Sequence, residues 1–106
     1  TYTETLIIDV GVDLIGDGTA TNIDGGIRVD ANNVTIQDLE ILDGASILGE
    51  TAGVYVNNNV DGLTIDTVTF TRSGTVDGDG SRGVVTSTAG VSNLTIQNST
   101  FTGWAT

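Results

Sequence analysis

The stretch VTIQDLEI at residues 34–41 decides the fold, because it recurs along the chain. Related stretches are LTIDTVTF at residues 63–70 and LTIQNSTF at residues 94–101, and a degenerate copy begins at Val12. The four copies start 22, 29 and 31 residues apart. Self-similarity at such spacings is typical of solenoids, in which each repeat adds one coil to a stack.

A second apolar column precedes each copy of this stretch. The segments LII, IRV, VYV and VVT begin at residues 6, 27, 54 and 84, so they lie 21, 27 and 30 residues apart. The spacing between successive segments therefore increases along the chain by similar amounts in both columns. Coils that carry loops of different length produce this covariation, whereas chance similarity would not keep two columns in step.

In each copy apolar and polar residues alternate, as they do in a strand, and this alternation is interrupted once by a single extra residue. Val34 and Ile36 are expected to point inward, while the residues between them point outward. At Asp38 the phase shifts by one residue, and such a shift indicates a tight bend in the left-handed backbone region, where Asn and Asp are tolerated. Asn98 fits the same corner, and Thr67 fits it less well.

These patterns predict an all-β chain, a right-handed single-stranded parallel β-helix of about four coils that forms one domain over residues 1–106. Each coil would hold about three short strands and stack on the previous one at about 4.8 Å. A two-sheet sandwich is the main rival, but its hairpins would not repeat one strand–corner–strand motif in register. Two interior ladders are expected: Ile36, Ile65 and Ile96; Ile41, Phe70 and Phe101.

Composition excludes several kinds of site and partner. The chain of 106 residues has no Cys and no His, so it cannot build a disulfide framework, a thiolate metal site or a histidine-dependent catalytic pair. Its formal net charge is −11, which disfavours nucleic acid and anionic lipid as partners. No apolar run approaches the length of a membrane span. We expect neither nucleic-acid binding nor membrane insertion.

The pattern Asn-x-(Val/Leu)-Thr-Ile-x-(Asn/Asp)-x-x-(Ile/Phe) at residues 32–41, repeated in tighter form at residues 93–101, resembles the parallel β-helix repeat of the pectate-lyase-like superfamily. The N-terminal stretch is similar to the opening coils of NosD-type periplasmic proteins and carbohydrate-active β-helices. The resemblance implies the fold and leaves the activity open, since that superfamily includes lyases, hydrolases, esterases, epimerases, tailspikes and adhesins. The Gly-His-Gly and Arg-x-Lys motifs of its hydrolases do not occur here.

Two expected loop insertions, residues 43–53 and 72–83, account for the longer spacings. The resemblance implies a cleft on the sheet that follows such loops, where Arg28, Tyr55 and Val85 would form one outward column. A tyrosine there can stack on a sugar ring, and an arginine can pair with a carboxylate or sulfate, although an outward tyrosine also suits an ordinary strand. The candidate carbohydrate-binding residues are Arg28, Tyr55, Asn57, Arg72 and Arg82.

Calcium is the only cofactor that the sequence suggests. Asp77, Asp79 and Ser81 place oxygen ligands at alternate positions, a spacing that can wrap a hard cation. The stretch lacks the glycine position and the final bidentate glutamate of an EF-hand loop, and an acidic turn is the alternative interpretation.

The sequence therefore predicts a β-helix segment of a secreted or cell-surface protein of bacterial type, with its targeting signal elsewhere, that associates with polysaccharide without a visible catalytic set. The alternatives are a structural spacer or adhesin stalk, and a piece of a polysaccharide lyase or epimerase whose catalytic residues lie in other coils. The ends of a solenoid expose strand edges unless they are capped, so either other residues of a larger protein cap them or copies of the chain associate end to end.

Overall fold

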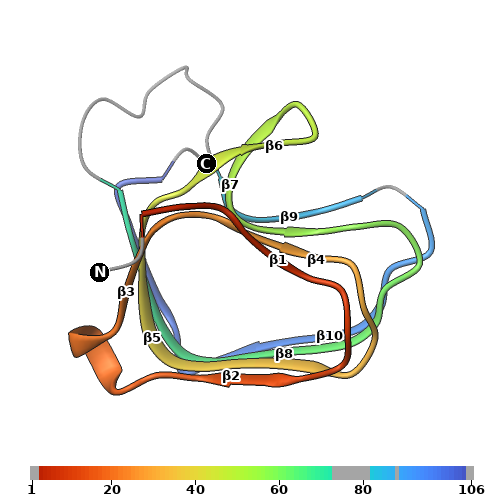
Figure 1. The fold of residues 1–106 in the computed structure, drawn as a ribbon, viewed down its shortest axis with the longest axis horizontal. Coiled ribbons are helices and arrows are strands. Elements are labelled where there is room, and N and C mark those ends of the chain that lie inside the picture. The colour runs from red at the N-terminus through yellow and green to blue at the C-terminus, as the bar shows by residue number, and fades with distance from the viewer. Residues whose placement is uncertain (1–2, 73–81, 88, 105–106) are drawn as a thin grey trace.

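The computed structural model describes residues 3–72, 82–87 and 89–104. In it the chain alternates between two parallel sheets, one coil after another, so the predicted all-β parallel β-helix is confirmed (Figure 1). The chain runs clockwise in this view from β1 to β2 and β3, and each later coil lies farther from the viewer. The solenoid is therefore right-handed.

Four parallel strands, one from each coil, form what we call the first sheet, and a short antiparallel strand extends it. The parallel strands pair in the order β1, β4, β7, β9. Their bounds, with the antiparallel strand last, are β1 (Leu6–Ile8), β4 (Ile27–Val29), β7 (Glu50–Val56), β9 (Arg82–Thr86) and β6 (Ala45–Ile47).

The second sheet is also parallel and bends at its middle. Two long strands, β5 and β8, run through the bend, while the first and last coils use separate strands on either side of it. Its strands are β2 (Asp13–Ile15), β3 (Asn22–Gly25), β5 (Val34–Asp43), β8 (Asp61–Thr71), β10 (Ser92–Gln97) and β11 (Thr100–Thr102). A single turn of 3-10 helix, η1 (Gly18–Ala20), lies at the bend of the first coil, and the described chain contains no helix with the length and apolar character that a membrane crossing requires.

The bend in the second sheet lies at the residues where the sequence breaks phase. Asp38, Thr67 and Asn98 have φ angles of 57°, 55° and 53°, so all three adopt the predicted left-handed conformation. On each side of Asp38 and Thr67 the burial pattern alternates and returns its apolar residues to the interior. One residue in this conformation therefore turns the chain without turning the apolar face outward.

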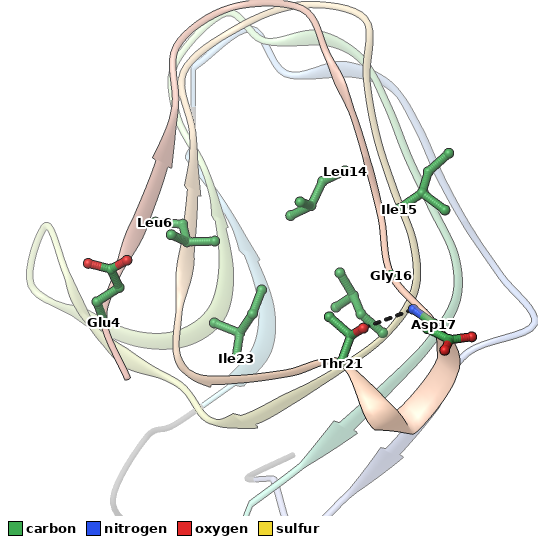
Figure 2. Close-up of a pocket in the computed structure, with 9 residues that line it drawn as sticks. Glu4, Leu6, Leu14, Ile15, Gly16, Asp17, Thr21 and Ile23 are labelled. Atoms are coloured by element: carbon green, nitrogen blue, oxygen red, sulfur yellow. Dashed lines mark hydrogen bonds between the residues drawn. The ribbon is translucent and has the colours of Figure 1, made fainter. Parts of the chain in front are cut away.

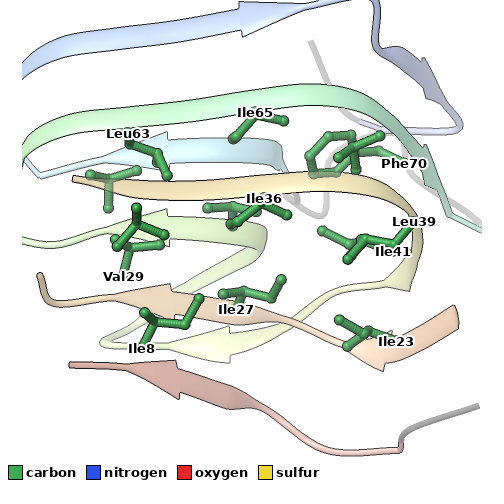
Figure 3. Packing of buried hydrophobic residues seen from close by; sticks show 14 of the residues in the cluster. Ile8, Ile23, Ile27, Val29, Ile36, Leu39, Ile41, Leu63, Ile65 and Phe70 are labelled. Atoms are coloured by element: carbon green, nitrogen blue, oxygen red, sulfur yellow. The ribbon is translucent and has the colours of Figure 1, made fainter. Parts of the chain in front are cut away.

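The predicted interior ladders are present and in register. Ile36 lies opposite Ile65, which lies opposite Ile96. Phe70 lies between Ile41 and Phe101, and its ring stacks on that of Phe101 with centroids 4.4 Å apart. Figure 3 shows Ile36, Ile65, Ile41 and Phe70 in the space between the two sheets. Parallel stacking thus places like residues of successive coils on top of one another.

Residues 43–53 contain a hairpin. β6 pairs antiparallel with the first part of β7, so that Ile47 lies opposite Glu50 across a two-residue turn. The turn residues Leu48 and Gly49 have φ angles of 50° and 85°, as a type I′ turn requires. The hairpin projects away from the coil, beyond the first sheet (Figure 1). The lengthening of this coil is therefore ordered, hydrogen-bonded structure.

Of the three residues at the bend, Asp38, Thr67 and Asn98, Thr67 is the one whose side chain suits a positive φ angle least. Replacing it with Asn tests whether this residue forms the bend. A β-branched residue is poorly suited to the left-handed region, whereas Asn enters it readily. We expect Thr67→Asn to raise the free energy of unfolding in urea by about 1 kcal/mol. Thr69→Asn, two residues along the same strand, is the matched control and should lower it slightly, since Asn is a poor strand former. Equal destabilisation by both changes would contradict the assigned corner.

Candidate functional site

The outer face of the first sheet carries one continuous row of side chains. Ile7, Arg28, Tyr55 and Val85 lie side by side in register, one from each parallel strand. Neighbours in such a row are separated by about 4.8 Å, so the row is about 14 Å long and runs along the solenoid axis. The sequence-predicted column of Arg28, Tyr55 and Val85 is thus a row on one face, and Ile7, which is 59% exposed, extends it.

Arg28 is held in place by the carboxylate of Asp30, two residues further along the chain. Its Nε lies 3.0 Å from Oδ1 and 2.8 Å from Oδ2 of Asp30, and both side chains are partly exposed. The pair compensates the charge of the guanidinium in a protein that is strongly acidic overall. Asp30 was not among the predicted site residues, although its position two residues after Arg28 places both on the same face of an extended chain.

Asn57 follows Tyr55 by two residues and begins the turn that leaves the first sheet. Its backbone N donates to the carbonyl of Val29, and its side-chain Oδ1 accepts from the backbone N of Asn58 at 2.8 Å. Residues two apart in an extended chain share a face, so Asn57 lies just beyond β7 on the same side of the solenoid as Arg28 and Tyr55.

The other two arginines lie elsewhere. Arg72 is partly buried at the end of β8, where its Nη1 donates to the carbonyl of Asp43 at 2.8 Å and its guanidinium lies 6.0 Å from the ring centroid of Trp104. Arg82 is exposed at the start of β9, opposite Ala52 and three residues before Val85. The geometry therefore separates Arg72 from the row and places Arg82 at the C-terminal end of the stack.

No metal centre is found in the part of the chain that the structure describes, where no three carboxylate groups converge. The predicted calcium ligands Asp77, Asp79 and Ser81 lie outside the described residues. The calcium prediction therefore stays a prediction.

Carboxylates of the second sheet are used in hydrogen-bonded ladders. Asp66 lies between Gln37 and Gln97 in the outward column and accepts from Asn98 Nδ2 at 3.1 Å, Thr67 Oγ1 at 2.9 Å and Gln97 Nε2 at 3.2 Å. These donors, Asn98 first, lower the pKa of Asp66.

A second ladder of hydrogen bonds lies at the start of the same strands, and it was not predicted from the sequence. Asp61 donates from its backbone N to Asn32 Oδ1 at 2.8 Å, and its carboxylate accepts from Ser92 Oγ at 3.1 Å and from Asn93 Nδ2. The signal was available, because polar residues (Asn32, Asp61 and Ser92) stand two positions before three of the four copies of the repeat.

Comparisons with protein-family models, with curated proteins and with solved structures return no significant match for this chain.

The ladder at Asp66 makes stability depend on acid. The pKa of Asp66 in the folded protein lies below its unfolded value of 3.8. The carboxylate therefore contributes fully to the free energy of unfolding at a pH well above 3.8. This contribution is lost as the pH falls from 3.8 through the lower folded-state pKa. We expect Asp66→Asn to flatten the fall of the urea midpoint below about pH 5, whereas Thr64→Ala, which removes no titrating group, should leave the shape of the profile unchanged. A profile that both changes affect equally would contradict the ladder's role.

Proposed function

We propose that the outer face of the first sheet is a polysaccharide-binding surface and that the module associates with glycan without acting on it. The observation that carries the proposal is the row of Ile7, Arg28, Tyr55 and Val85, which runs along the axis with apolar, charged and aromatic groups in register. A linear row of this kind suits an extended chain molecule better than a compact one. The row lies on rigid strands, so little ordering would be needed on binding.

The chemistry of the row favours uncharged sugar units. The ring of Tyr55 can stack on the apolar face of a pyranose, while the Arg28–Asp30 pair and the Asn57 amide offer donors and acceptors to hydroxyl groups. The formal charge of −11 opposes an anionic glycan. Asp30 also neutralises the one arginine of the row.

The resemblance of the repeat to the pectate-lyase-like superfamily supports a carbohydrate partner and a place in a secreted or cell-surface protein. The sequence has no histidine, so a histidine base cannot be built from this chain, which favours association over turnover. A lyase or epimerase remains the enzyme alternative, with its catalytic residues in other coils.

A structural spacer is the second candidate function. The observation in its favour is that polar side chains on the outer face of the second sheet, as at Asp61 and Asp66, form hydrogen bonds between successive coils and so strengthen the stack. In a spacer, the row on the first sheet would serve only as surface cover.

A glycan array, followed by calorimetry on any positive glycan, tests the proposal. We expect uncharged polysaccharides to bind without calcium, and Tyr55→Thr, which keeps a strand-forming residue, to weaken binding at least fivefold, or about 1 kcal/mol. Thr64→Ala on the second sheet is the matched control and should bind as the original chain does. Absence of binding to any uncharged glycan would refute the surface and leave the spacer, while binding that requires calcium would point to residues 72–83.

A further inference from the structure

Selectivity among glycans has to come from the outer face of the first sheet. A hollow of about 570 Å³ beside the first coil is lined largely by apolar side chains that point toward the solenoid interior, Leu6, Leu14 and Ile23 among them (Figure 2). Such a lining offers the hydroxyl groups of a sugar few hydrogen-bonding partners. The charged and polar groups of the candidate surface lie instead in the row on the first sheet and in a second column beside it.

This second column, which we call the polar column, follows the row by two residues in every coil and consists of Asp9, Asp30, Asn57 and Ser87. The backbone N of Asp30 donates to the carbonyl of Ile8, and the backbone N groups of Asn57 and Ser87 donate in the same way to the coil before them. The parallel ladder therefore continues one residue past the paired segments and places the four residues side by side. Asp30 thus has Asp9 as its neighbour on one side and Asn57 on the other.

Asp30 contacts one edge of the Arg28 guanidinium and leaves the rest of it open. Both carboxylate oxygens lie near Nε of Arg28, at 3.0 Å and 2.8 Å. The terminal nitrogens Nη1 and Nη2 have no acceptor among the described residues, and both side chains are partly exposed. Arginine carries donors on all three nitrogens. Those of Nη1 and Nη2 therefore remain for a ligand, while the positive charge is already compensated.

We propose that Asp30 sets the charge selectivity of this surface. It keeps Arg28 oriented as a hydrogen-bond donor to sugar hydroxyls, and it excludes glycans that carry carboxylate or sulfate groups. The inference rests on the proposed polysaccharide surface and names the class of glycan that the surface rejects and the residue that rejects it. Arg28 is the residue that touches the sugar, whereas Asp30 acts through Arg28 and is a positioning residue.

The selectivity follows from what an anionic group meets at the open edge of Arg28. A guanidinium without a partner attracts carboxylate or sulfate strongly, because charge-assisted hydrogen bonds are stronger than bonds to neutral hydroxyls. With Asp30 bonded to Nε, the approaching anion meets a guanidinium whose charge is compensated and a carboxylate of its own sign beside it. Like charges at neighbouring positions repel, whereas a hydroxyl group meets no such repulsion. The contact therefore favours uncharged ligands over anionic ones.

Two substitutions of Asp30 separate its charge from its contact. Asp30→Asn removes the charge and keeps a side-chain oxygen that can accept from Nε of Arg28, whereas Asp30→Ala removes both. The probes are an uncharged glycan that binds in the array and the carboxymethylated form of the same glycan, which has the same backbone and carries carboxylates. Both are titrated by calorimetry without calcium, and circular dichroism confirms that each variant is folded.

We expect Asp30→Asn to bind the carboxymethylated glycan roughly tenfold more tightly than the original chain does, and to lose this gain at high ionic strength, as a contact between charges must. Its affinity for the uncharged glycan should change less than about twofold. Asp30→Ala should also gain affinity for the carboxymethylated glycan, which keeps the test open if Asp30→Asn does not fold. It should bind the uncharged glycan roughly threefold more weakly, because Arg28 is no longer held in place.

Asp9→Asn is the matched control, because it removes the same charge from the neighbouring position of the polar column and leaves the contact of Arg28 with Asp30 intact. It should gain less than about twofold for the carboxymethylated glycan. Equal gains by Asp9→Asn and Asp30→Asn would overturn the proposal, since the overall charge of the face would then decide. Tight binding of the carboxymethylated glycan by the original chain, or no gain by either Asp30 variant, would overturn it as well.

Failure of the polysaccharide surface itself is a separate result. In that case the original chain binds no uncharged glycan in the array, before any variant is compared, and the selectivity of Asp30 falls with the surface. When the original chain does bind an uncharged glycan, the surface stands and the Asp30 variants decide the present inference alone.

Discussion

Parallel, in-register contact between successive coils is the constraint on which the rest of the structure depends. Each coil is too short to enclose a core, and it becomes stable only because its apolar side chains lie on those of its neighbours and its backbone groups bond to theirs. Ile65, with Ile36 on one side and Ile96 on the other, has this environment in full. Every lateral row and both ends of the molecule are consequences of the same stacking.

The architecture was predictable because the repeat specifies it twice, through apolar spacing and through the corner residue. Asp38 shifts the phase in the sequence and adopts the left-handed conformation in the structure. The hairpin at residues 43–53 was not predictable in the same way. Its type I′ turn is formed by Leu48 and Gly49, and Leu gives no turn signal at a position that normally favours Asn or Asp.

The candidate binding face was predictable only in part. Register along the columns placed Arg28 and Tyr55 together, since it follows from the repeat. The contact of Arg28 with Asp30 depends on side-chain rotamers, and the separation of Arg72 from the row depends on its contacts with Asp43 and Trp104 across the corner. The contacts of Arg72 join segments distant in sequence, which leave no mark on local periodicity, so the sequence could not assign them.

Engineered cross-links test parallel stacking directly, because the chain contains no cysteine of its own. In the parallel register Thr35 lies opposite Thr64 and Glu40 lies opposite Thr69, within the Cα separation of about 4.4–6.8 Å that a disulfide spans. Changing either pair to cysteine should give rapid, nearly complete oxidation of the monomer, whereas the crossed pairs 35 with 69 and 40 with 64 should not link. Efficient bonding of the crossed pairs, as antiparallel strands would give, would contradict the β-helix.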